Sequence, residues 1–275
     1  MVDHGALEKS DSGSAPRIAR RRTRSLSIED VPTVTRTDDP NSITAVIVGR
    51  RGSKGFPNKN SRVLAGKPMV VHSIDQARAS TCIDHVIVST DGDEIAAAAR
   101  HQGVEVVMRP PSLASDQASV DAAVRHAIEA SGVASRRIVI LYANVPIRPF
   151  DLIDQAIDRL DETGADSVQS YESVGKHHPW WMVRIGDDDS ISPWHRNDVY
   201  RRQDLPPAHF PDGGVIALTR ESLFTVDPHA PHAFLGRDRR AIINPIGSVV
   251  DIDDEIDMLV AEAIIRRRDG DQERS

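Results

Sequence analysis

Residues 43–60 read ITAVIVGRRGSKGFPNKN, a short apolar run followed by a loop rich in glycine and cations. The run 43–48 predicts a buried strand. Glycine lets the backbone approach a phosphate closely, and Arg50, Arg51, Lys54 and Lys59 offset its negative charge. Ligands of open α/β sheets bind where strands end, so this stretch predicts a polyphosphate site. It lacks the Gly-Lys-Ser/Thr of a Walker A loop and the glycine spacing of a dinucleotide fingerprint.

The chain around this loop alternates short β-branched runs with helical patterns, which predicts a parallel sheet covered by helices on both faces. Further strands are predicted at 85–89, 104–108, 138–142, 167–170, 214–218 and 249–252. Helices are predicted at 69–79, 93–101, 120–130, 152–161 and 255–267, with Asp93, Ser119 and Asp151 as N-caps. The expected fold class is α/β, with a mostly parallel, doubly wound, Rossmann-like sheet.

The composition is that of a globular protein, since the 275 residues are 39% hydrophobic and only 4% aromatic, which predicts an aliphatic core. Cys82, the one cysteine, excludes an internal disulfide and any zinc site built on paired thiolates. No apolar run approaches the roughly 20 residues that span a bilayer. The N-terminus shows no apolar secretory signal. We therefore expect no membrane partner and a cytoplasmic location.

Charge separates residues 1–42 from the rest of the chain. Seven basic and seven acidic residues balance in this stretch, so the net charge of −7 belongs to residues 43–275. An acidic body argues against nucleic acid as a partner. Residues 1–42 are predicted to be a disordered tail, although the arginines between 17 and 24 also suit a localisation signal. Residues 43–275 form the expected domain, within which 174–212, with all three tryptophans, is either a lid or a segment that packs on a partner.

Motifs in a fixed order carry a resemblance to a known family. They are Arg50-x-Gly-Ser-Lys-Gly-x-Pro-x-Lys59-Asn60, Ser89-Thr-Asp-Gly-Asp93, Arg109-Pro110 with LASDQAS at 113–119, Pro146-Ile-Arg148, His177-His-Pro179, RQDLP at 202–206, Asp212-Gly-Gly214 and Val250-Asp-Ile-Asp253. This pattern resembles the acylneuraminate cytidylyltransferases, the CMP-sialic acid synthetases. The resemblance covers residues 43 to about 265. It implies a nucleotidyltransferase fold with a protruding dimerisation arm at 174–212, and a homodimer with sites completed across the interface.

The resemblance also implies a reaction, in which the anomeric hydroxyl of a 2-keto sugar acid attacks the α-phosphate of CTP and releases pyrophosphate. The nucleotide-binding residues would be Arg50, Gly52, Ser53, Lys54, Lys59, Asn60 and Arg109. Of these, Arg50 and Lys54 would hold the β- and γ-phosphates and Lys59 the α-phosphate. Asn60 would contact the ribose and Arg109 the cytosine. The catalytic group would be Arg50, Lys59, Asp251 and Asp253.

Asp251 and Asp253 lie two residues apart at the end of a predicted strand, so their side chains point to the same side. Two carboxylates suit a hard cation, and we expect Mg²⁺ or Mn²⁺ as the cofactor. An alternative is that Asp251, Asp253, Asp254 and Asp257 only favour the N-terminus of the last predicted helix.

The sugar side departs from the family pattern. Tyr142 stands where the family has a glutamine, Trp180 and Trp181 where an apolar residue and a lysine are usual, and Asp212 where an asparagine is usual. The residues expected at the sugar are Tyr142, Arg148, Trp181 and Arg202, the last two from the neighbouring subunit. On the nucleotide side, Val120 replaces a frequent base-contacting serine. These changes predict a flatter, less cationic pocket and a different acidic sugar, such as another nonulosonic acid.

Two other functions stay open. A sugar-nucleotide glycosyltransferase also uses Asp-x-Asp, but it binds a diphosphate and does not need so many loop cations. A regulatory protein that binds nucleotide without turnover would keep Arg50 and Lys59 and lose sugar contacts. His177 and His178 lack further ligands at suitable spacing, which predicts a structural or substrate-side role and no metal site. Cys82 is assigned no chemistry.

Overall fold

The structure is a computed structural model that describes residues 39–52, 55–115 and 117–272. Contacts divide the chain into two units, Met1–Thr33 and Val34–Ser275, and every described residue belongs to the second. The tail predicted at 1–42 therefore lies outside the described residues except for its last four.

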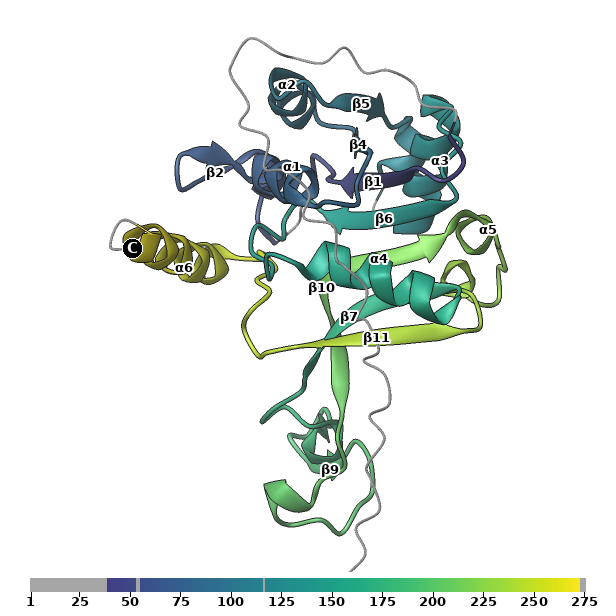
Figure 1. Ribbon diagram of the computed structural model, residues 1–275. Coiled ribbons are helices and arrows are strands. Elements are labelled where there is room, and N and C mark those ends of the chain that lie inside the picture. The colour runs from purple at the N-terminus through teal and green to yellow at the C-terminus, as the bar shows by residue number, and fades with distance from the viewer. Residues whose placement is uncertain (1–38, 53–54, 116, 273–275) are drawn as a thin grey trace, which may run out of the picture. The chain divides into compact units, whose positions relative to one another are not determined.

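A seven-stranded sheet in the order β11-β7-β10-β6-β1-β4-β5 forms the centre of this unit (Figure 1). Its strands are β1 (Ile43–Val48), β4 (His85–Thr90), β5 (Glu105–Met108), β6 (Arg137–Tyr142), β7 (Ser167–Ser173), β10 (His209–Thr219) and β11 (Arg239–Asn244). Only β10 runs antiparallel to its neighbours in this sheet. The predicted mostly parallel α/β sheet is thus confirmed.

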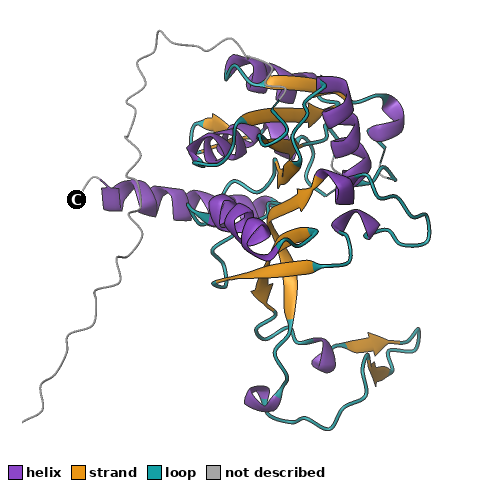
Figure 2. Ribbon diagram, turned by 45° about the vertical axis from the view of Figure 1, so that its right-hand side comes forward, coloured by secondary structure: helices purple, strands orange, loops and turns teal. Residues whose placement is uncertain are grey.

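Helices cover both faces of the sheet (Figure 2), because its central strands are apolar on both sides. In β1, Ala45 and Ile47 pack with α1 (Met69–Ala79), α2 (Asp93–His101) and α4 (Leu152–Thr163). Val46 and Val48 point to the other face, with α3 (Val120–Ser131), α5 (Arg220–Leu223) and the short helix η5 (Ala233–Leu235). The alternation is that of a strand buried on both faces.

The helix starts agree closely with the sequence, whereas the caps agree only in part. Ser119 is the N-cap of α3, and its Oγ accepts a hydrogen bond from the Ala122 N–H at 3.4 Å. Asp151 occupies the N-cap position of α4 without a side-chain bond. The predicted cap Asp93 is wrong, because Gly92 is the N-cap of α2. Asp93 lies in the first turn, where its negative charge interacts favourably with the helix dipole.

One predicted strand is absent, and several observed strands were not predicted, of which β11 is the longest. The strand expected at 249–252 is wrong, because the segment forms a single antiparallel bridge between Ile147 and Val250. The strand β11 was missed, since it begins with the exposed Arg239 and Arg240 and does not read as a buried run. An edge strand needs no continuous apolar sequence, because one of its sides is open to solvent.

The chain between β7 and β10 leaves the main sheet. It carries η3 (Pro179–Trp181), β8 (Val183–Ile185), β9 (Ile191–Pro193) and η4 (Arg202–Asp204), and β8 pairs only with β9. Val183, Ile185, Ile191 and Trp194 are exposed there.

The helix α6 (Glu255–Gln272) packs through Ala261 on a third apolar cluster that includes Phe56 and Leu64 of β2 (Val63–Leu64). Antiparallel to β2 runs β3 (Lys67–Pro68), and the two form a sheet of their own. Among the described helices, none combines the length and apolar character needed to cross a bilayer.

Candidate functional site

A cavity of about 290 Å³ opens where β1 and β6 end at the carboxyl edge of the sheet. It is lined by Val48, Gly49, Arg50, Lys59, Asn60, Arg109, Leu113, Ser115, Ala118, Ser119, Val120, Tyr142 and Asn144. The strands β4 and β6 lie on opposite sides of β1, so the chain order reverses here. Such a switch point is the usual ligand site of a doubly wound sheet.

The loop after β1 is anchored by its backbone. The Gly49 N–H donates to the Ser89 carbonyl at 3.1 Å, and a Cβ on Gly49 would lie 2.8 Å from the Ala143 Cβ, so only glycine fits. Asn58 adopts a left-handed conformation (φ 58°) that turns the chain into η1 (Lys59–Ser61). The loop therefore brings Lys59 to the cavity. Ser53 and Lys54, both predicted at the nucleotide, lie outside the described residues, and Gly52 is exposed.

Asn60 supplies an unpaired acceptor to the cavity wall. Its side chain is 3% exposed, and its Nδ2 donates to the Arg50 carbonyl at 2.9 Å. Its Oδ1 is buried and has no hydrogen-bond partner among the described residues. A buried acceptor without a donor costs free energy, so the position suits a ligand hydroxyl.

The predicted acidic pair meets this loop from far along the chain. Lys59 Nζ lies 2.6 Å from Asp253 Oδ1, and Asn144 Nδ2 donates to Asp251. Partial desolvation, with the nearby charge of Asp253, raises the pKa of Asp251 to about 6. Of the four carboxylates in the alternative, Asp254 and Asp257 do act at the helix start, because Asp254 accepts from the Ile256 N–H and Asp257 from the Asp253 N–H.

Asp251 and Asp253 are also the residues that fit a divalent cation. Among the described residues, no three His, Cys, Asp or Glu side chains are grouped as a metal site. Mg²⁺ needs fewer protein ligands when it also binds phosphate oxygens, typically one or two carboxylates. Both carboxylates have exposed surface. The donor set therefore fits Mg²⁺ held jointly by protein and nucleotide.

Arg109, which follows β5, also lines the cavity. Its Nε donates to Ser89 Oγ at 2.9 Å and one of its terminal nitrogens donates to the Ser89 carbonyl at 2.8 Å. Burial lowers the pKa of Arg109 to about 10, against the opposing effect of Asp91. The guanidinium therefore remains charged at neutral pH. Val120 lines the same cavity, as expected from its position after Ser119.

The predicted sugar residues are only partly brought together. Tyr142 lines the cavity, and burial and the charge of Asp251 raise its pKa. Arg148 is 2% exposed, and its donors are taken up by groups that include Gln76 Oε1 (2.6 Å) and the Gly214 carbonyl (2.5 Å). This geometry favours a role for Arg148 in holding the loop after β6, whose Tyr142 and Val145 carbonyls it also contacts.

The other two sugar candidates lie in the segment between β7 and β10. Trp181 Nε1 donates to the Val199 carbonyl at 3.2 Å, and Arg202 lies in η4. Neither lines the cavity of its own chain. His178 is 4% exposed and bonds the Pro206 carbonyl at 3.0 Å, which supports its structural role.

Sequence reasoning missed three residues at this site. Asn144 holds Asp251, Ser89 holds Arg109, and Asp91 accepts from the Arg51 N–H at 2.8 Å. The available signal was a polar residue at the carboxyl end of a buried strand, where side chains face the ligand edge.

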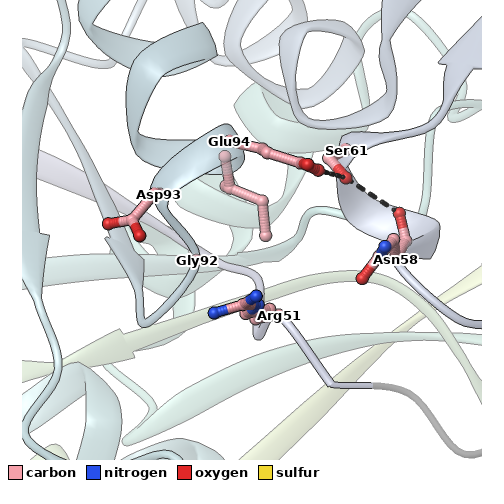
Figure 3. Close-up of a pocket in the computed structure, with 7 residues that line it drawn as sticks. Arg51, Asn58, Ser61, Gly92, Asp93 and Glu94 are labelled. Carbon is pink, nitrogen blue, oxygen red and sulfur yellow. Dashed lines mark hydrogen bonds between the residues drawn. The ribbon is translucent and has the colours of Figure 1, made fainter.

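A smaller polar recess of about 180 Å³ lies beside the loop, between η1 and the start of α2 (Figure 3). Ser61 Oγ donates to Glu94 Oε2 at 2.7 Å and to the Asn58 carbonyl at 3.1 Å. Arg51 and Asp93 also line it. These contacts join the loop to α2.

Replacing Asp251 by Asn is expected to stabilise the metal-free protein at pH 7.5. The folded-state pKa of Asp251 is raised from 3.8 to about 6, so the folded protein binds this proton more tightly than the unfolded chain. Stability from this group is present at low pH and is lost as pH rises through about 6. Because solvent screens this partly exposed group, we expect a stabilisation of only about 1 kcal/mol. This corresponds to a rise of roughly 2–4 °C in the midpoint of thermal unfolding.

Thermal melts in chelator at pH 7.5 and pH 4.5 measure this effect. The difference between the Asp251→Asn variant and the wild type should shrink at the lower pH. A variant that is less stable than the wild type at pH 7.5 would contradict the raised pKa.

The chain is similar in sequence to known cytidylyltransferases. The family model described as cytidylyltransferase matches residues 44–208. The chain is 32% identical to the N-acylneuraminate cytidylyltransferase of Streptococcus agalactiae serotype V, over 64% of this chain and 43% of that protein. It is 28% identical to the CMP-N,N'-diacetyllegionaminic acid synthase of Legionella pneumophila, over 81% of this chain and 96% of that protein.

Among solved structures, a CMP:2-keto-3-deoxy-manno-octonic acid synthetase complexed with CTP shares the fold, with a TM-score of 0.64 and 15% identity over 83% of this chain and all of that one. The chain spans less than half the length of the streptococcal relative. The family match covers more than half of the 275 residues, including the loop after β1 and the strand that carries Tyr142. The chain therefore belongs to the cytidylyltransferase family.

Proposed function

We propose that this chain transfers CMP from CTP to a nonulosonic acid or a related acidic 2-keto sugar. The anomeric oxygen attacks the α-phosphorus, the bond to the β-phosphate oxygen breaks, and pyrophosphate leaves. The hydroxyl proton passes to one carboxylate of the pair Asp251 and Asp253. The names of the relatives support both the nucleotide and the class of sugar.

One observation carries the proposal. Lys59 and Asn144, which line the cavity, are bound to Asp253 and Asp251 from the other end of the chain. Cations for a polyphosphate and an unpaired acceptor for a hydroxyl thus line one cavity, and carboxylates for a divalent ion lie against its lining residues. Nucleotidyl transfer depends on this placement of charge.

The nucleotide roles follow from position. Lys59 would neutralise the α-phosphate, with Arg50 on the outer phosphates. Asn60 Oδ1 would accept a ribose hydroxyl, and Arg109 would lie at the cytosine. Gly52, Ser53 and Lys54 belong to the same loop and are assigned to the phosphates as well.

Mg²⁺ or Mn²⁺ is the proposed cofactor, held by Asp251 and Asp253 with phosphate oxygens. When bound, such an ion polarises a phosphate and neutralises charge on it. The Lys59 ammonium forms an ion pair with Asp253, one of these two carboxylates, and holds it at the edge of the proposed phosphate site.

The experiment that tests the function is pyrophosphate release with Mg²⁺ from CTP, with UTP, ATP and GTP as controls. The sugar panel contains N-acetylneuraminate, N,N'-diacetyllegionaminate, further nonulosonates and 3-deoxy-manno-octulosonate. Release with CTP and at least one of these sugars is expected. A protein that neither releases pyrophosphate nor binds CTP would refute the proposal.

A nucleotide-binding protein without turnover is the second candidate. Tyr142 and Trp181 replace polar and cationic residues of the family pattern, and Tyr142 lines the cavity. Tight CTP binding, with no release across the whole panel, would favour this function.

We also propose a homodimer in which Trp181 and Arg202 complete the site of the partner. The segment 174–208 exposes Val183, Ile185 and Ile191, and such apolar surface is typical of an interface. The proposed location is the cytoplasm, where CTP is available.

Subunit complementation tests the shared site. Lys59→Ala and Arg202→Ala are each expected to be inactive, because one lacks the phosphate cation and the other the sugar cation. Co-expressed in equal amounts, they form mixed dimers with one intact site, so about a quarter of wild-type activity should return. Activity that stays absent in proven mixed dimers would place Arg202 in its own subunit's site or outside the reaction.

A further inference from the structure

The last residues of β4 connect the two halves of the nucleotide cavity. Ser89 is fully buried, and its carbonyl accepts from the Gly49 N–H at 3.1 Å and from Arg109 at 2.8 Å. Its Oγ accepts from Arg109 Nε at 2.9 Å and donates to the Ala123 carbonyl in α3 at 3.5 Å. One carbonyl oxygen therefore touches both the phosphate loop and the base-side arginine.

Asp91 makes a second connection two residues later. Its Oδ1 accepts from the Arg51 N–H at 2.8 Å. Its negative charge raises the pKa of Arg109 and so partly offsets the lowering that burial causes. The turn is fixed by a bond from the Gly92 N–H to Thr90 Oγ1 at 3.0 Å. Gly92 leaves little space, since a Cβ there would lie 3.2 Å from the Arg51 Cβ, and Figure 3 shows the two residues next to each other.

Neither Ser89 nor Asp91 lines the cavity. Their contacts are nonetheless directed at two groups that do, Arg109 and the backbone around Arg50. The connection has little freedom, because Ser89 is held by β-sheet pairing with Val48 and Val107. Ser89 therefore holds the Arg109 guanidinium and the start of the loop at Gly49 in one arrangement.

We propose that Ser89 and Asp91 are positioning residues that couple recognition of the base to the geometry of the phosphate loop. A pyrimidine that engages Arg109 correctly holds Ser89, and through it the loop, in the arrangement that places Lys59 at the α-phosphate. Discrimination between CTP and UTP then appears in kcat as well as in KM. This inference rests on the proposed function and deepens it.

The experiment measures kcat and KM for CTP and UTP, and CTP affinity by calorimetry, in Ser89→Ala, Asp91→Ala and Asp91→Asn. Ser222→Ala is the matched control, because Ser222 is also buried and bonds a carbonyl, that of Phe234, at 2.8 Å, but lies outside the cavity lining. Ser89→Ala should lower the CTP-to-UTP ratio of kcat/KM about tenfold, the effect of losing one bond to a charged group. The control should leave this ratio unchanged.

The two variants of Asp91 distinguish the loss of its hydrogen bond to Arg51 from other changes in the side chain. Asp91→Ala should lower kcat for CTP about tenfold, whereas Asp91→Asn retains an Oδ1 acceptor for the Arg51 N–H and should keep most of the activity. Asp91 is only half-buried, so its variants are expected to fold even if Ser89→Ala does not. Thermal melts check each variant.

The outcomes are distinct. Ratios and kcat values within twofold of wild type in both alanine variants would overturn the coupling while leaving the proposed function intact. Equal losses in Asp91→Ala and Asp91→Asn would overturn the role of the Asp91–Arg51 bond. A wild-type chain that does not bind CTP would overturn the proposed function and this inference together.

Discussion

Replacing Lys59 by Ala lowers kcat by about 10²–10³-fold, the loss typical of removing one group that stabilises transition-state charge. Lys59 is the cation proposed for the α-phosphate, and it is held in place by Asp253 at 2.6 Å. The KM for CTP should rise much less, because other loop cations bind the outer phosphates. Steady-state kinetics with saturating Mg²⁺ measure both parameters.

The chain offers a matched control for this variant. Lys67 forms an ion pair of the same length, 2.6 Å, with Asp75 at the surface. Exposed pairs of this kind contribute little to stability, roughly 0–1 kcal/mol. Lys67→Ala should therefore keep wild-type turnover. If Lys59→Ala retains wild-type kcat, or if both variants lose the same activity, Lys59 does not act on the phosphate.

The sheet was predictable where burial on both faces imposes a continuous apolar run. The strands β1 and β6 satisfy this condition, and Ile47 and Leu141 are fully buried. The same reasoning failed for β11, which lies at the edge of the sheet and whose first two residues are exposed arginines. It also failed at 249–252, where Val250 and Ile252 pack with α6 in a separate cluster and the segment pairs through a single bridge from Val250.

The site was predictable from residue types and their place after strands, but not from contacts across the chain. The glycines and cations after β1 indicate phosphate, and the structure brings Lys59 to Asp253. Motif spacing does not predict the hydrogen bond from Asn144 to Asp251, because 107 positions separate the two residues. Arg148 shows the opposite case, because a motif arginine that reads as a substrate ligand is buried and donates to carbonyls of its own loop and of β10.

Asp212→Ala is expected to destabilise the fold by about 3–5 kcal/mol, the cost typical of breaking a buried charged network. Asp212 is 8% exposed and accepts from Ser170 Oγ (2.5 Å), the Gly214 N–H (2.9 Å) and Asn244 Nδ2 (2.6 Å). Its charge also favours the charged form of Arg148. Alanine leaves these donors unpaired and removes part of the compensation for a buried guanidinium.

Urea denaturation measures this loss, and an exchange of partners tests its cause. In Asp212→Asn alone, the Asn244 amide loses its carboxylate acceptor and faces a second amide at residue 212. Asp212→Asn combined with Asn244→Asp again pairs an amide donor with a carboxylate acceptor. The double variant should recover most of the stability, which a double-mutant cycle quantifies. An Asp212→Ala midpoint equal to wild type would show that the network contributes nothing.

The same network has a consequence for activity. Asp212 holds the irregular part of β10 between Pro211 and Ile216, where Gly213 has φ +75° and a Cβ would lie 3.7 Å from Asp251 Oδ2. Loss of Asp212 should therefore move backbone at Asp251, the proposed catalytic carboxylate, as well as lower stability. In the exchanged double variant, turnover should return together with stability. Stability regained without turnover would instead show that the negative charge must lie at residue 212, close to Arg148 and Asp251.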